Sequence, residues 1–109
     1  MSRDTGLEEL IAVDLAGIDG LTEKAMFGGW AWLINGNLMC GARADGMLVR
    51  LGAGRDGWAL ALPGIGPMLS RGKPMNGWLR AGPDAYGDDD LRRRLIAEAL
   101  AFVRGLPPK

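Results

Sequence analysis

The residues that could do chemistry in this sequence begin with a glycine-rich loop. Gly52-Ala53-Gly54-Arg55-Asp56-Gly57 matches the G-x-G-x-x-G pattern, in which glycines let the backbone approach a dinucleotide phosphate at a helix N-terminus. A helix after this loop would end before Pro63, which makes it shorter than the crossover of a dinucleotide-binding unit. A flexible strand-to-helix loop is therefore the favoured interpretation. A small-molecule or nucleotide binder that uses the loop from Gly52 to Gly57 is an alternative hypothesis.

Arginine and lysine side chains supply a second candidate chemistry, the binding of phosphates or other anions. Arg92, Arg93 and Arg94 follow one another, and Lys73 lies in a separate turn. Together with Arg43 they support the hypothesis of direct nucleic-acid binding, for which affinity falls steeply with salt. The simpler interpretation of the three arginines is a solvated helix face. The formal charge of zero, from 13 basic and 13 acidic residues, argues against strong non-specific DNA binding.

The composition predicts no catalytic, cofactor or metal site, and therefore no enzyme. Histidine is absent, which removes the commonest general base and the commonest metal ligand. The single cysteine, Cys40, has no histidine with which to form a nucleophilic pair, and we expect it to pack in the core. The run Asp88-Asp89-Asp90 is typical of a helix start, where the dipole favours negative charge, rather than of a metal cluster.

The cysteine count and the N-terminal sequence indicate the compartment. One cysteine allows no intrachain disulfide, and the polar start Met1-Ser2-Arg3-Asp4 carries no signal-peptide pattern. Both features predict a reducing cytoplasm. No apolar run approaches the roughly 20 residues that span a bilayer, so we expect no membrane partner.

The elements that must position these residues follow from hydrophobic spacing and turn signals. A capping box at Thr5-Gly6-Leu7-Glu8 predicts a helix over 5–18, and Asp88 begins a long helix that stops at Pro107. Between them, turn dipeptides predict three or four strands over 23–51, a short helix near 55–62, and two strands near 68 and 78–81. The length of 109 residues fits a single domain, 1–109. We predict an α+β fold, an antiparallel sheet of about five strands with helices packed on one face.

Two dipeptides fix the expected strand register. Asn35-Gly36 is a strong signal for a two-residue type I′ hairpin turn, and Asp45-Gly46 is interpreted as a second one. Loop length then determines which residues face each other. The predicted pairs are Ile34–Asn37, Leu33–Leu38, Trp32–Met39, Ala31–Cys40 and Trp30–Gly41, followed by Ala44–Met47, Arg43–Leu48, Ala42–Val49, Gly41–Arg50 and Cys40–Leu51.

Alternation along these strands predicts two unlike sheet faces. The face that the helices should cover is wholly apolar, with Ala31, Leu33, Leu38, Cys40, Ala42, Met47, Val49 and Leu51. On the other face Gly41 leaves room for a Trp30 indole to lean toward the Arg50 guanidinium in a cation–π contact. Because Trp, Met and Arg are enriched at protein interfaces, this face is a candidate surface for self-association; the alternative is a partly buried layer covered by a helix or by the C-terminal strands. The candidate interaction residues are Trp30, Trp32, Met39, Arg43 and Arg50.

An ordered set of short motifs resembles the TfoX N-terminal domain family, from about Glu23 to the C-terminus. The resemblance implies an α+β fold with helices on one side of an antiparallel sheet, and a role in competence, the bacterial uptake of DNA, through transcriptional co-regulation. It offers no catalytic residues. The matching residues are Met26-Phe27-Gly28-Gly29, Leu33, Asn35-Gly36-Asn37, Gly41, Leu48-Val49-Arg50, Pro63-Gly64, Pro67-Met68, Gly72-Lys73-Pro74-Met75, Gly77-Trp78 and Leu106-Pro107-Pro108-Lys109.

These observations lead to one main hypothesis about function. The chain is expected to be a non-enzymatic regulatory domain of the competence-regulator type that works as a homodimer with a transcription-related protein partner. Direct nucleic-acid binding through arginine and lysine is the second hypothesis, and binding of a small molecule at the glycine-rich loop is the third.

Overall fold

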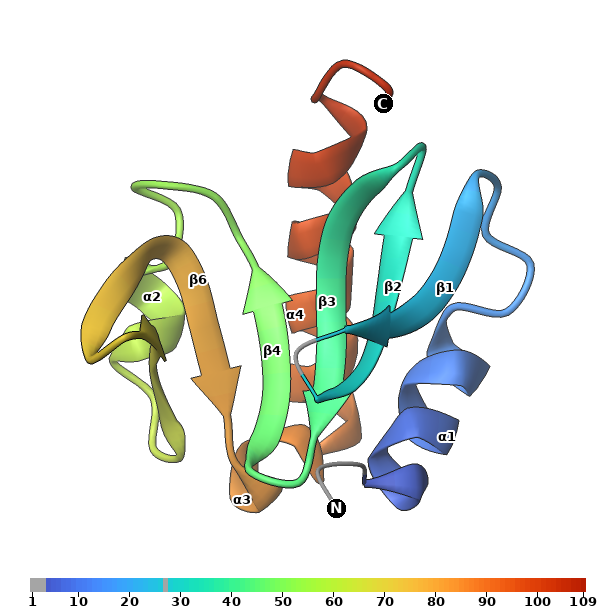
Figure 1. Cartoon of the computed structure of the whole chain (residues 1–109). Helices are drawn as coiled ribbons and strands as arrows, with labels where there is room; N and C mark the ends of the chain where they lie inside the picture. The colour runs from blue at the N-terminus through green and yellow to red at the C-terminus, as the bar shows by residue number, and fades with distance from the viewer. Residues whose placement is uncertain (1–3, 27) are drawn as a thin grey trace.

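The computed structural model describes residues 4–26 and 28–109 and contains one six-stranded antiparallel sheet with helices behind it (Figure 1). The strand order across the sheet is β1-β2-β3-β4-β6-β5. This confirms the predicted α+β class, with six strands and a short additional helix, α3. The elements are α1 (Thr5–Asp14), β1 (Leu21–Met26), β2 (Gly29–Ile34), β3 (Asn37–Arg43), β4 (Gly46–Arg50), α2 (Gly57–Leu60), β5 (Ile65–Ser70), β6 (Lys73–Ala81), α3 (Pro83–Tyr86) and α4 (Asp89–Arg104).

Each of the two longer helices has an aspartate as its N-cap. Asp88 caps α4 and its Oδ1 accepts a hydrogen bond from the Leu91 amide at 3.1 Å, as the acidic run predicts. The cap of α1 is Asp4, whose Oδ1 accepts from the Leu7 amide at 3.0 Å, so the predicted capping box at Thr5 is wrong by one residue. The predicted end of α1 at residue 18 is also wrong, because the helix ends at Asp14 and Gly17, with a φ of +82°, lies in the turn that follows.

The main core lies between the sheet and the helices. Helix α4 runs behind β3 and β4, and α1 lies behind the β1–β2 side of the sheet (Figure 1). Burying this apolar surface is the main stabilising contribution to the fold. None of the helices in the described ranges is long and apolar enough to cross a membrane. The fully buried large side chains include Leu7, Ile11, Leu15, Trp32, Ile34, Met39, Met47, Val49, Leu51, Leu79 and Leu95.

The hairpin between β2 and β3 has the predicted turn but not the whole predicted register. Asn35 and Gly36 both have positive φ, at +52° and +83°, as a type I′ turn requires. The pairs Ile34–Asn37 and Leu33–Leu38 are confirmed, but Trp32 then pairs with Cys40 rather than with Met39. The register shift leaves Met39 as an extra residue in β3, a β-bulge.

The turn between β3 and β4 also differs from the prediction. Arg43 pairs with Gly46, so the two turn residues are Ala44 and Asp45. The Arg43 guanidinium stabilises this turn through hydrogen bonds of 2.9 and 2.8 Å to the two Asp45 carboxylate oxygens. Gly46 is needed for a different reason, because a Cβ there would lie 2.6 Å from the Ala81 carbonyl oxygen in the adjacent β6. Each residue of β3 therefore faces a β4 residue two positions earlier than predicted.

These two register changes have opposite consequences for the sheet faces. The shift between β3 and β4 is two residues, which preserves the faces, so Cys40, Ala42, Met47 and Val49 lie in the main core as expected. The bulge shifts β2 by one residue relative to β3, which turns every side chain to the opposite face. Trp32 and Ile34 consequently lie under the helices. Ala31 and Leu33 lie on the other face, with Gly41 and Leu48.

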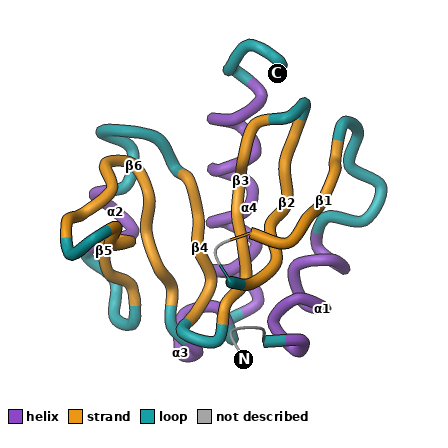
Figure 2. Tube along the Cα trace, viewed as in Figure 1, coloured by secondary structure: helices purple, strands orange, loops and turns teal. Residues whose placement is uncertain are grey.

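The side of the sheet without helices is partly covered by the chain itself. Hairpin β5–β6 forms the left edge of the sheet as seen in Figure 2. Leu48, Met68 and Trp78 form a second buried cluster here, and Leu38 and Met75 pack against it. The alternative of a partly buried layer covered by C-terminal strands is therefore correct for this part of the sheet.

Candidate functional site

The five residues of the predicted interaction surface do not share one face. Trp32 and Met39 are in the main core, with 1% and 0% of their surface exposed, so neither is available to a partner. Trp30 packs against the edge of that core, and its Nε1 donates to Glu23 at 2.8 Å. Only Arg43 and Arg50 occupy strand positions on the side without helices, and the Arg50 guanidinium also reaches Phe102 of α4. The bulge at Met39 is the physical cause, because the pattern of residues in β2 and β3 does not reveal it.

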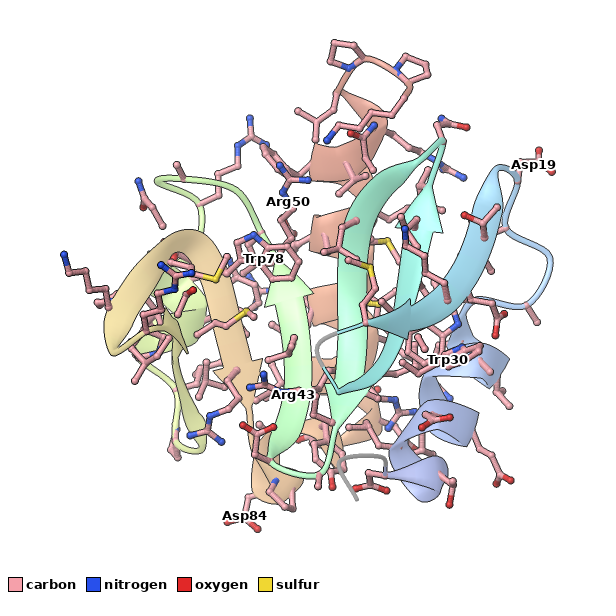
Figure 3. All side chains as sticks on the ribbon, viewed as in Figure 1. Asp19, Trp30, Arg43, Arg50, Trp78 and Asp84 are labelled. Carbon is pink, nitrogen blue, oxygen red and sulfur yellow. The ribbon has the colours of Figure 1, made fainter. Side chains whose placement is uncertain are left out.

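Arg50 contacts aromatic rings other than the predicted one. Its guanidinium carbon lies 6.0 Å from the centre of the Trp78 ring and 5.5 Å from that of Phe102. Its Nη1 also donates to the Leu38 carbonyl at 3.3 Å. Figure 3 shows Arg50 beside Trp78, whereas Trp30 lies toward α1 on the opposite side of the view. The predicted pair of Trp30 with Arg50 is therefore wrong.

Basic side chains gather on the side of the sheet without helices. The cross-strand pairs place Lys24, Ala31, Gly41, Leu48 and Arg80 in one row from β1 to β6. Arg43 and Arg50 follow Gly41 and Leu48 by two positions in their strands, and so belong to the same side. We define the basic face as Lys24, Arg43, Arg50 and Arg80. Within the described strands, no acidic residue occupies a position on this side.

A cleft of about 390 Å³ lies at the lower end of the basic face. Arg43, Asp45 and Arg80 line it together with Gly66, Pro67 and Leu69 of β5. Both guanidinium groups are held by Asp45, Arg43 through the carboxylate and Arg80 through a 2.9 Å hydrogen bond to the Asp45 carbonyl. Leu69 is 55% exposed. We call this hollow the arginine cleft.

The arginine cleft has the chemistry of a carboxylate-binding site with an apolar wall. A guanidinium carries five N–H donors in a fixed plane; Arg43 uses two of them on Asp45, and Arg80 uses one. The remaining donors can bind an incoming carboxylate, and such charge-assisted hydrogen bonds are stronger than neutral ones. The sequence reasoning missed Arg80, although its alternation with the apolar Leu79 and Ala81 is a period-two signal for a side chain on the sheet's polar side.

The three consecutive arginines do not form one surface. Successive helix residues are about 100° apart around the axis, so their side chains leave α4 in three directions. Arg92 is buried. Its Nε donates to Asp14 at 2.7 Å, and its Nη1 donates to Asp89 at 2.8 Å and to the Tyr86 carbonyl at 3.0 Å. The hydrogen bond to Asp14 raises the pKa of Arg92 and keeps it charged. A nucleic acid cannot reach Arg92 in this fold.

The other two arginines of the run also have partners. Arg93 is exposed and its Nε lies 3.4 Å from Asp14 Oδ1. Arg94 stacks on Trp58 of α2, with its guanidinium carbon 3.9 Å from the ring centre. Lys73, the remaining candidate for anion contact, is exposed at the start of β6. The predicted nucleic-acid residues are thus distributed over separate elements.

The glycine-rich loop has a packing role. The amides of Leu51 and Gly52 both donate to the Gly77 carbonyl, which ties the loop to β6. A Cβ on Gly52 would lie 2.6 Å from the Phe102 ring, and its φ of +99° is unfavourable for other residues. The helix that follows, α2, has four residues, so the predicted short helix is present but provides little of a helix dipole.

Cys40 lies in the core, where burial raises the pKa of its thiol to about 12. Since the thiolate is the reactive form, we expect Cys40 to resist alkylation by iodoacetamide at neutral pH in the folded protein. In denaturant, Cys40 should react with iodoacetamide at the rate of an accessible free thiol. Mass spectrometry of timed samples measures this, and rapid labelling of the native protein would contradict the buried placement.

A comparison with protein-family models identifies the chain. The model described as the TfoX N-terminal domain matches residues 14–103, which is most of the sequence. The chain belongs to the TfoX N-terminal domain family. Comparison with curated proteins and with solved structures gave no significant match. The match includes all six strands and almost the whole of α4, so the basic face and the arginine cleft lie on the family domain itself.

Proposed function

We propose that this TfoX N-terminal domain is a non-catalytic interaction module that acts in competence regulation as a homodimer. The observation that carries the proposal is the arginine cleft, where Arg43 and Arg80 are fixed by Asp45 beside an apolar wall. Its partner is an acidic protein segment in which a carboxylate residue is next to an apolar one. The carboxylate binds the two guanidinium groups, and the apolar side chain packs on Leu69 and Pro67.

A protein segment fits this cleft better than a nucleic acid does. A protein that binds phosphate backbones engages many basic side chains in a continuous stripe. Here the basic face is limited to four side chains, and the Asp45 carboxylate is already paired with one of them, Arg43. Leu69, more than half exposed, provides an apolar contact that a phosphate backbone would not use.

The charge reversal Arg80→Glu is expected to weaken binding of an acidic peptide at least about tenfold, because charge-assisted hydrogen bonds contribute about 1.5–3 kcal/mol. The probe is a fluorescein-labelled peptide that alternates aspartate with leucine, titrated with the protein while fluorescence anisotropy is recorded. Arg55→Glu is the matched control, because Arg55 is an exposed arginine in the loop before α2, outside the basic face. Equal affinity of the two variants for the peptide would contradict the proposal.

A second arm of the same titration separates the protein partner from a nucleic acid. A labelled single-stranded oligonucleotide replaces the peptide, at low and at moderate salt. Tight, salt-sensitive binding of the oligonucleotide with no peptide binding would favour the nucleic-acid hypothesis instead.

The regulatory role has its own readout in cells. In the bacterium that encodes the protein, transformation frequency should fall when the gene is deleted, and should recover with the wild type and with Arg55→Glu. Arg80→Glu should fail to restore it. A deletion strain that takes up DNA normally would exclude the competence role.

A further inference from the structure

The helical side of the molecule carries an apolar strip that the monomer does not use. Leu10 and Val13, one turn apart on α1, are 37% and 73% exposed. A valine exposed to this degree gains nothing from burial, and it is a poorer helix former than alanine, leucine or the long polar residues. Local structure therefore gives no reason for Val13. We define the α1–α4 seam as Leu10, Val13, Ile18, Ile96 and Leu100.

Val13 stands on a ridge between two hollows of the seam. One hollow, of about 410 Å³, is lined by Val13, Ile18, Ile96 and Leu100. The other, of about 290 Å³, also has Val13 in its lining and includes Leu10. A cavity of about 150 Å³ holds a benzene molecule, so the larger hollow has room for aliphatic side chains from another molecule.

We infer that the α1–α4 seam binds the same seam of a second copy of this chain around a two-fold axis. In a two-fold interface, a residue that projects from one copy must enter a recess of the other, and the reverse contact must form simultaneously. The seam meets this condition because the Val13 ridge and its neighbouring hollow lie side by side on one surface. This inference rests on the proposed function for the homodimer itself and assigns its surface.

Charge favours the seam over the sheet as the self-association surface. The rim of the seam carries both signs, with Glu9 and Asp89 near Leu10 and with the exposed Arg93 beside both hollows. Two copies can therefore align opposite charges. The basic face lacks acidic strand residues, and two copies meeting there would bring like charges together, which is unfavourable. We therefore place the homodimer interface on the helices rather than on the sheet face that the sequence predicts.

The test is the oligomeric state of the 109-residue protein by sedimentation velocity over a wide concentration range. The wild type should show a reversible monomer–dimer equilibrium, and Val13→Lys should raise the dimer dissociation constant at least about tenfold, because it places a charge in an apolar contact. Leu60→Lys is the matched control, since Leu60 of α2 is an exposed leucine outside the seam. Monomeric wild type at all concentrations, or equal dimerisation of Val13→Lys, would overturn the inference.

A cross-linking experiment gives an independent result. Single variants Val13→Cys and Ala97→Cys are mixed and oxidised, because Ala97 lines the hollow that receives Val13. A covalent dimer of the two different variants is expected, and Val13→Cys mixed with Leu60→Cys should form none. Arg80→Glu should retain the dimer, so failure of the arginine cleft and failure of the seam are distinguishable. Absence of the mixed covalent dimer in a sample that dimerises would place the interface elsewhere.

Discussion

Replacing Trp32 with alanine is expected to lower the free energy of unfolding by about 3–5 kcal/mol, the usual cost of truncating a large buried aromatic side chain. Trp32 is 1% exposed and packs between the sheet and the helices. Removing the indole leaves a cavity that the rigid sheet cannot close. Since whole domains are stable by only about 5–15 kcal/mol, the variant would be partly unfolded near physiological temperature.

Urea denaturation followed by circular dichroism measures this change. Trp30→Ala is the control, because Trp30 is in the same strand but packs only at the edge of the core, so it should lose less stability. Trp32→Phe should also lower the free energy of unfolding by less than Trp32→Ala does. The Trp32 Nε1 is buried with no hydrogen-bond partner in the described structure, and the phenyl ring therefore sacrifices no hydrogen bond. A fully stable Trp32→Ala variant with impaired self-association would instead indicate that Trp32 lies on an interaction surface, as the sequence predicts.

Replacing Arg92 with alanine is expected to cost about 3–5 kcal/mol as well, for an electrostatic reason. The Arg92 and Asp14 side chains are 3% and 5% exposed, and their ion pair at 2.7 Å joins α4 to α1. Without the guanidinium, the Asp14 carboxylate remains buried without its main partner, and the Tyr86 carbonyl loses its 3.0 Å donor. An unpaired buried charge is far more costly than a broken surface pair.

The adjacent arginine provides the control for this prediction. Arg93 is the next residue, is 61% exposed and makes a longer 3.4 Å contact to the same aspartate. Arg93→Ala should therefore change stability by less than about 1 kcal/mol. The double variant Arg92→Met with Asp14→Leu should recover much of the loss, because both charges are replaced by apolar groups. Equal effects of the two single alanine variants would contradict the buried ion pair.

The seam inference and the Arg92 network concern the same two helices, and they make separable predictions. Arg92 fixes the position of α1 against α4 within one chain, whereas Val13 is a mostly exposed residue at the seam and makes no part of that ion pair. A change at Val13 should alter association without altering monomer stability. A change at Arg92 should alter stability first, and the seam would lose its shape only as a consequence.

Several features of this protein were determined by residues close together in the sequence. Asn35-Gly36 specifies the type I′ turn because both positions need positive φ, which these residues tolerate. Asp88 caps α4 because its side chain reaches an amide three residues later. The apolar alternation of β3 and β4 placed Cys40, Ala42, Met47 and Val49 in the core even though the predicted turn was wrong, since a shift of two residues preserves the faces.

The functional surfaces were decided by tertiary structure. The bulge at Met39 buries that side chain in the core and turns Trp32 from the predicted surface into the interior. We attribute the bulge to packing of Trp32 and Met39 against the helices, and no short sequence pattern encodes that packing. Arg43 and Arg80 meet only because β6 inserts beside β4, and Arg92 is buried only because α1 brings Asp14 to it. A turn or a helix cap depends on residues only a few positions apart in the chain. The residues that meet here are 37 or 78 positions apart, so these contacts form only in the packed fold.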